Sequence, residues 1–309
     1  MIPLPPQEDK AKSSIQIREI LDRLESVGYS SVALVHTVFG VPKEKDDRPE
    51  VVFADLPSES AKRKRSLRVF KRLHVVVENA SDVAFFAPTE KEHKQKLLLD
   101  YDIVSISPRN DLAWQAACST ATMAEIITLD YTSGRGGIQL PFRMRPGDVA
   151  AAIERNIVFE ILYAPAILEV PKRKALVQTA RMFQLASLAS KPKLILSAGD
   201  CNVMALRSPG DLVNIVQTVL RFDPSTANDS LSTNTEYVIE RARQRRLGGV
   251  GGSNHVVDVV WGQVDLVKET IPKATVDTKA KGSNPKVSSK AEDAGTAGEE
   301  TEDGFIRLT

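Results

Sequence analysis

The chain has 309 residues, a length that accommodates one large domain with tails or two small domains. Hydrophobic residues make up 42% and charged residues 26% of the chain, a composition typical of globular proteins that excludes disorder throughout. The formal net charge of +1 favours neither nucleic acid nor an acidic partner. Any basic surface must therefore be local.

The cysteine content and the apolar runs indicate the cellular compartment in which the protein acts. Cys118 and Cys201 are too few for a disulfide framework or a CxxC metal site. The opening segment MIPLPPQEDK lacks the apolar centre of a signal peptide, and no apolar run approaches the roughly 18 to 20 residues that span a bilayer. We expect an intracellular protein without membrane contact.

The body of the chain alternates helical segments with short apolar runs. The first helix is predicted in SIQIREILDRLESVG, where Ile17, Ile20, Leu21 and Leu24 have helical spacing and Gly28 suits the left-handed residue that ends a helix. Six strands are predicted in the apolar, β-branched runs SVALVHTVF, LHVVV, DIVSIS, EIITL, IVFEILY and KLILSA. Helices are predicted between and after them in LAWQAAC, DVAAAIERN, KALVQTARMFQLAS and GDLVNIVQTVL.

This alternation indicates an α/β fold with a parallel sheet buried on both faces. The first strand is followed by no GxGxxG, which disfavours a dinucleotide-binding fold. The evenness of the repeat favours a TIM-like (β/α) barrel with seven or fewer regular strands. Two long polar connections, residues 41–70 and 132–147, interrupt the repeat, and loops after strands lie at the functional face of a barrel.

Composition also divides the chain. Residues 271–309 are rich in Lys, Ser, Gly, Ala and acidic residues and contain few large apolar ones, so we expect a disordered polar tail. Residues 15–270 are predicted to form a single barrel domain. The RLGGVGGSNH segment lacks the GK[ST] of a phosphate-binding loop and is predicted to be a flexible linker inside that range.

The residues give no sign of a catalytic centre. The four histidines have no HxH, HExxH or HxxxH spacing, and His36, at the end of a predicted strand, is expected to be packed or hydrogen-bonded rather than metal-bound. The chain has no GxSxG, and Cys118 lies on the apolar side of a predicted helix, which favours core packing over nucleophilic catalysis. We therefore expect no catalytic residue, no metal and no cofactor.

Basic clusters are the stronger signal. The run KRKRSLRVFKR, from Lys62 to Arg72, has seven cations and no acid, and includes Lys71. Further cations, predicted at the ends of elements, are Arg109, Arg143, Arg145, the run from Lys172 to Lys174, and RARQRR with Arg243. Such local clusters suit phosphate groups. The alternative is a solvated surface or, for KRKR, a nuclear import signal.

Several of these segments together resemble one family. The strand NIVFEILYAPAI, residues 156–167, has a Phe-Glu-aliphatic-aliphatic-Tyr-x-Pro-Ala pattern. It resembles the barrel-shaped protein subunit of eukaryotic and archaeal ribonuclease P, which eukaryotes also place in RNase MRP. The stretches GYSSVALVHTV, KRLHVVVENAS, YDIVSISP, LRSPGDLVNIV and STNTEYVIERARQRR agree with it in order.

The resemblance implies a noncatalytic, RNA-binding barrel related to PHP-type metallophosphoesterases that has lost the metal ligands. RNA would carry the active site that removes 5′ leaders from precursor tRNA, and the partners would be the ribonuclease P RNA, the MRP RNA and a small ferredoxin-like protein subunit, in the nucleus and nucleolus. By the same resemblance, Arg72, Arg109, Arg173 and Arg207 face RNA. Glu160, Tyr163 and Pro165 instead shape a strand end, with Glu160 as a buried carboxylate paired with an arginine.

One departure from the family concerns the start of the chain. Family members begin with a short strand before a proline-rich turn, whereas here only Met1 and Ile2 precede PLPPQ. Residues 1–14 are therefore predicted to be the remnant of that strand with its turn, which leaves the strand count open. The rival interpretations are a free-standing PHP-type metal-dependent phosphoesterase and a scaffold that binds only protein.

Overall fold

The computed structural model describes residues 2–3, 10–43, 45–53, 67–87 and 92–247. The predicted polar tail at 271–309, most of the predicted linker and the KRKR run at 62–65 lie outside the described residues.

The described residues form one parallel sheet of seven strands in the order β1-β2-β3-β4-β5-β6-β7. The six predicted strands are confirmed as β2 to β7, and a two-residue β1 pairs with β2 through Ile2 and Leu34. The strands are β1 Ile2–Pro3, β2 Ser31–Phe39, β3 Arg68–Val77, β4 Ile103–Pro108, β5 Ile126–Leu129, β6 Val158–Leu162 and β7 Leu194–Ser197. No pairing between β7 and β1 closes this sheet within the described residues, so it is a TIM-like half-barrel.

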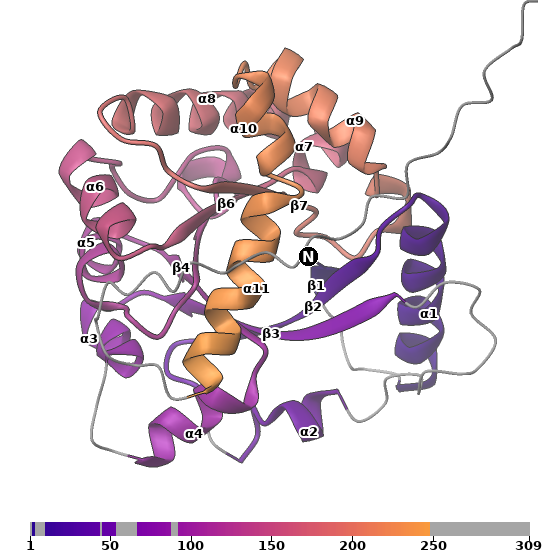
Figure 1. Cartoon of the computed structure of the whole chain (residues 1–309), viewed down its shortest axis with the longest axis vertical. Helices are drawn as coiled ribbons and strands as arrows, with labels where there is room; N and C mark the ends of the chain where they lie inside the picture. The colour runs from indigo at the N-terminus through magenta and orange to yellow at the C-terminus, as the bar shows by residue number, and fades with distance from the viewer. Residues whose placement is uncertain (1, 4–9, 44, 54–66, 88–91, 248–309) are drawn as a thin grey trace, which may run out of the picture. The chain divides into compact units, whose positions relative to one another are not determined.

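Helices alternate with the strands, as the sequence predicts (Figure 1). The longer ones are α1 Lys10–Ser26, α4 Glu92–Asp100, α5 Asp111–Thr120, α6 Pro146–Glu154, α8 Val170–Ala186 and α11 Thr233–Arg246. The shorter ones are α2 Pro49–Val52, α3 Ala80–Val83, η1 Ala84–Phe86, η2 Arg135–Gly137, α7 Ala164–Leu168, η3 Val203–Ala205, α9 Pro209–Asn214, the π-helical η4 Ile215–Val219 and α10 Pro224–Asp229.

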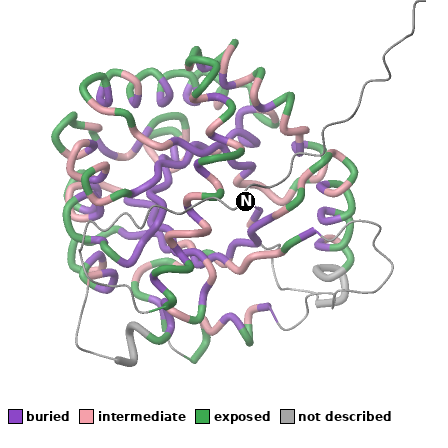
Figure 2. The backbone as a smooth tube through the Cα atoms, in the orientation of Figure 1, coloured by how far each residue is buried: buried purple, intermediate pink, exposed green. Residues whose placement is uncertain are grey.

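Local sequence explains these elements. The predicted apolar stripe of α1 is confirmed, because Ile17, Ile20, Leu21 and Leu24 are all buried. The helix is followed by Gly28 with φ of +99°, a conformation that costs glycine little. Every residue of β4, β5 and β7 is buried, as expected for strands covered on both faces (Figure 2).

Helix α11 covers the end of the sheet at which the strands begin. Its Val238 and Ala242 form a buried apolar cluster with residues near the starts of five strands, Ala33, Ile103, Ile126, Val158 and Ile195. Figure 1 shows α11 crossing in front of the sheet. The segments that follow each strand lie at the opposite end, where the strands finish.

Candidate functional site

The centre of the barrel holds a buried ion pair. Arg72 lies in the middle of β3 and is 1% exposed, and its guanidinium donates to both carboxylate oxygens of Glu160 on β6 at 2.7 and 2.6 Å. Thr128 and Ser197 also donate to the carboxylate, each at 2.6 Å. Arg72 donates further to Ser105 at 2.7 Å.

The electrostatics of this pair follow from its partners. Burial alone would raise the pKa of Glu160, but the charge of Arg72 and the hydrogen bonds from Arg72, Ser197 and Thr128 outweigh it and hold that pKa well below its usual range. The carboxylate is therefore ionised at neutral pH, and its two oxygens already accept four hydrogen bonds.

These contacts correct one prediction and explain another. The expectation that Arg72 faces RNA is wrong, because β3 begins at Arg68 and places Arg72 inside the barrel rather than at the edge of a strand. Glu160 is the expected buried carboxylate, and its arginine partner is Arg72. The sequence did not reveal that pairing because the two residues lie 88 positions apart.

Next to the pair lies His74, two residues further along β3. Its Nδ1 is 2.9 Å from the Ser105 hydroxyl, and burial, reinforced by the charge of Arg72, lowers the pKa of His74 to about 4. In the part of the chain that the structure describes, no three His, Cys, Asp or Glu side chains gather so that they could hold a metal ion. The Arg72 cation would in addition repel a metal at the centre of the barrel.

The two other residues weighed as reactive are packed. His36 Nε2 lies 3.1 Å from Asp47 Oδ1, and Cys118 is fully buried in α5. Burial, followed by the nearby charge of Asp148, raises the pKa of the Cys118 thiol, which disfavours the reactive thiolate.

Five of the predicted RNA-binding residues lie at the end of the barrel where the strands finish. Arg109 directly follows β4, and its guanidinium pairs with Asp130, which directly follows β5, at 3.1 Å. Arg143 and Arg145 lie in the connection from β5 to α6, and both are exposed. Arg135 of η2 is a further exposed cation in the same connection, and no sequence pattern marks it as a binding residue.

The other two follow β6 and β7. Arg173, in the first turn of α8, is exposed and donates to the carbonyl oxygens of Ala166 at 3.0 Å and Ile167 at 3.4 Å. Arg207, between β7 and α9, is half-buried and donates to the Met204 and Leu206 carbonyls at 2.9 and 3.1 Å. Both guanidiniums are thus held by backbone oxygens rather than by carboxylates.

The predicted strand-end residues stabilise this arrangement. Tyr163 directly follows β6 and is buried, and its hydroxyl accepts a 3.4 Å hydrogen bond from the Arg207 amide. Pro165 is buried in the first turn of α7, where its missing N–H has no cost. The Tyr29 hydroxyl donates to the Arg207 carbonyl at 3.1 Å. The backbone carrying Arg207 is therefore fixed from two sides.

Two predicted cations lie apart from this end. Arg243 is on α11, which covers the opposite end of the barrel, and lies 3.9 Å from Glu240. Lys71 neighbours Arg72 in β3, and its ammonium lies 5.8 Å from the centre of the Phe53 ring. The structure therefore does not bring all eight predicted residues onto one surface.

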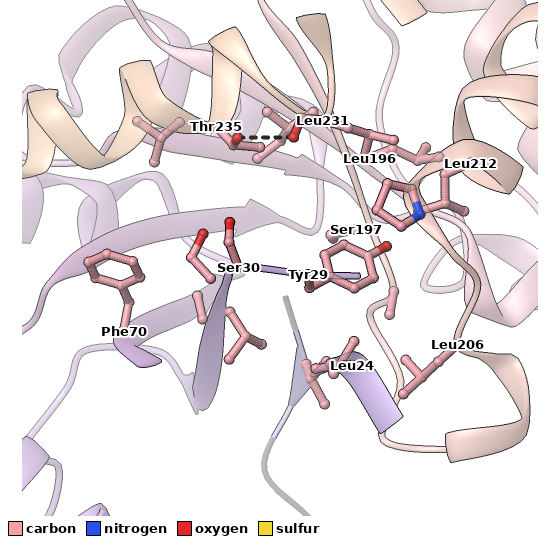
Figure 3. A pocket seen from close by; sticks show the side chains of 18 of the residues that line it. Leu24, Tyr29, Ser30, Phe70, Leu196, Ser197, Leu206, Leu212, Leu231 and Thr235 are labelled. Atoms are coloured by element: carbon pink, nitrogen blue, oxygen red, sulfur yellow. Dashed lines mark hydrogen bonds between the residues drawn. The ribbon is translucent and has the colours of Figure 1, made fainter. Parts of the chain in front are cut away.

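A pocket of about 240 Å³ is lined by residues of β1, β2 and β7, and β1 and β7 are the two edges of the unclosed sheet (Figure 3). Its lining includes Leu24, Tyr29, Leu196, Leu212 and Thr235, and none of its lining residues is charged. Such a lining does not suit phosphate groups. In the described part of the chain, no helix has the length and apolar character that crossing a bilayer requires.

Comparison with known proteins identifies the family. The model of the family described as RNase P subunit p30 matches residues 2–247, which includes the barrel and α11. The chain belongs to the RNase P subunit p30 family. The predicted TIM-like fold and the family suggested by the sequence motifs are therefore both confirmed.

Individual relatives agree with this assignment. The chain is 25% identical over 234 residues to mouse ribonuclease P protein subunit p30, covering 74% of this chain and 82% of the mouse protein. It is 29% identical over 150 residues to the Arabidopsis thaliana protein GAMETOPHYTE DEFECTIVE 1, covering 48% of this chain but only 24% of that protein. A chain in the cryo-EM structure of archaeal ribonuclease P with mature tRNA has the same fold, with a TM-score of 0.54 at 15% identity over 79% of this chain and 92% of that one.

Proposed function

We propose that this chain is a noncatalytic, RNA-binding protein subunit of ribonuclease P that supports removal of 5′ leaders from precursor tRNA. The observation that carries the proposal is the match of the p30 family over residues 2–247. The barrel centre agrees with a noncatalytic role, because the Arg72–Glu160 ion pair occupies it and the Glu160 carboxylate also accepts hydrogen bonds from Thr128 and Ser197.

The RNA-binding surface in this proposal is the end of the barrel where the strands finish. Arg143, Arg145 and Arg173 are exposed there, and Arg109 and Arg207 are partly exposed. Guanidinium groups fixed by backbone oxygens lose little freedom when they bind phosphate, and each can donate two parallel hydrogen bonds. Arg109 would have to exchange or share its contact with Asp130.

The same proposal includes the other components of the ribonucleoprotein complex. The partners would be the ribonuclease P RNA, the MRP RNA, a small ferredoxin-like protein subunit and other subunits, with precursor tRNA contacted indirectly. The chain would then act in rRNA processing as well as tRNA processing, in the nucleus and nucleolus.

The experiment is a salt titration of RNA binding. Replacing Arg143, Arg145 or Arg173 with Gln should each weaken binding of the ribonuclease P RNA by about 1 kcal/mol or more and reduce the salt slope by roughly 0.7 to 0.9. Arg18→Gln, at an exposed position on α1, is the matched control. An unchanged salt slope in all three variants would refute the proposal that this surface binds RNA.

A PHP-type phosphoesterase remains the competing proposal for this fold. It predicts metal-dependent hydrolysis of a model phosphodiester that survives repeated purification. The noncatalytic proposal predicts no such rate, with or without added zinc or manganese.

A further inference from the structure

A second group of cations gathers at the other end of the barrel, where the strands begin. Arg155 lies between α6 and β6, Lys193 directly precedes β7, and Arg241 is on α11, which covers this end. In Figure 1, α11 lies across this end of the sheet. Three segments that are distant in the sequence thus each supply one cation.

Contacts that are not ion pairs hold each of these side chains in place. Arg241 donates to the Asn156 carbonyl, next to Arg155, and Arg155 donates to the Cys118 carbonyl at 3.2 Å. The Lys193 ammonium lies 4.2 Å from the centre of the Tyr237 ring, and Tyr237 is one helical turn before Arg241. The three cations are therefore positioned around the same turn of α11.

The cations repel one another, and nearby carboxylates are engaged elsewhere. Burial, followed by the charge of Arg241, lowers the pKa of both Arg155 and Lys193. Burial lowers the pKa of Arg241 and the charge of Glu125 acts to raise it, but the Glu125 carboxylate forms its 2.6 Å ion pair with Arg245, a fourth cation beside Arg241. Among the ion pairs of the described residues, none joins a carboxylate to Arg155, Lys193 or Arg241.

The backbone at the same place turns at the end of α6. Asn156 has φ of +60°, a left-handed conformation that costs a non-glycine residue energy, although asparagine tolerates it better than most. This conformation presents the Asn156 carbonyl to the Arg241 guanidinium. Asn156 directly follows the residue that caps the end of α6, where the amides of Asn156 and Ile157 donate to the carbonyls of Ile153 and Ala152 at 2.8 and 3.0 Å.

We propose that Arg155, Lys193 and Arg241 form a phosphate-binding site at the end of the barrel opposite the arginines after the strands. Like charges that are held together and form no ion pair with a carboxylate are stabilised when an anion binds between them. The phosphate could belong to an RNA strand or to a small free phosphate compound. With RNA at both ends, the barrel would contact two separate stretches of nucleic acid.

The first arm of the test uses the full chain and inorganic pyrophosphate. A ligand that binds only the folded state raises the melting temperature. Pyrophosphate should raise the melting temperature of the wild type and of Arg181→Met, a control at an exposed cation on α8, but not that of Lys193→Met or Arg241→Met. Lys193→Met removes a cation–π contact and no backbone hydrogen bond, so it keeps the test valid if Arg241→Met folds poorly.

The second arm uses a fluorescent oligouridine at low salt. Lys193→Met and Arg241→Met should each raise its Kd about tenfold, the effect of losing one charge-assisted hydrogen bond, and reduce the salt slope by about 0.7. Repeating the titration in a chain that already carries Arg143→Gln, Arg145→Gln and Arg173→Gln separates this site from the surface proposed above.

Each outcome decides the proposal. An effect on oligouridine alone assigns the site to an RNA strand, and an effect on pyrophosphate alone assigns it to a small phosphate compound. If all variants respond to both ligands as Arg181→Met does, the proposed site does not exist, whatever the result at the other end of the barrel.

Discussion

Removing the Arg72 cation should strongly destabilise the barrel. In Arg72→Met, the Glu160 carboxylate stays buried with hydrogen bonds from only Thr128 and Ser197. Breaking a buried pair by removing one partner typically costs about 3 to 5 kcal/mol, because an uncompensated charge remains. We expect a loss of that size in the free energy of unfolding at pH 7, measured by urea denaturation.

The pH dependence and a double variant test the reasoning behind that value. Without Arg72, burial should raise the pKa of Glu160 above its unfolded value, so the variant should regain stability as the pH falls and the carboxyl protonates. Arg72→Met combined with Glu160→Leu should be more stable than Arg72→Met alone, since no charge remains buried. The explanation would be wrong if Arg72→Met lowered the free energy of unfolding by less than about 1 kcal/mol. It would also be wrong if the double variant lost as much stability as the two single variants together.

Two further predictions concern other charged groups. Arg245 is 5% exposed and forms a 2.6 Å ion pair with Glu125, so Arg245→Met should lower the free energy of unfolding by about 3 kcal/mol or more. Arg246→Met removes a partly exposed ion pair with Asp102 and should lower it by less than about 1 kcal/mol. Equal losses in urea denaturation would show that burial does not decide the strength of these pairs. His74 should titrate near pH 4 in NMR spectra, and because its folded pKa is lowered, the stability it contributes should be present above about pH 6.5 and lost as the pH falls towards 4. A midpoint near 6.5 would contradict its burial beside Arg72.

The strands could be predicted because their apolar, β-branched runs carry a local signal. Several short helices could not, since segments such as Pro49–Val52 and Pro224–Asp229 span only one to two turns and depend on tertiary contacts. The role of Arg72 was misassigned for a related reason. The family resemblance and the cation run both suggested an exposed arginine, but in β3 alternate side chains point into the barrel, and Glu160 on a distant strand compensates the charge.

At the two ends of the barrel, too, some residue positions could be predicted from the sequence and others could not. Arg109, Arg173 and Arg207 could be assigned to one end because parallel strands all finish there. The meeting of Arg155 with Arg241 could not be predicted, since it depends on how α11 crosses the strand beginnings.

The proposed membership of a ribonucleoprotein is tested most directly by recovering the tagged chain from cells that express it and sequencing the RNA bound to it. Ribonuclease P RNA should be strongly enriched, together with MRP RNA, and both should be reduced when Arg143, Arg145 and Arg173 are replaced by Gln. Recovery of the intact chain with neither RNA enriched would contradict the proposed membership.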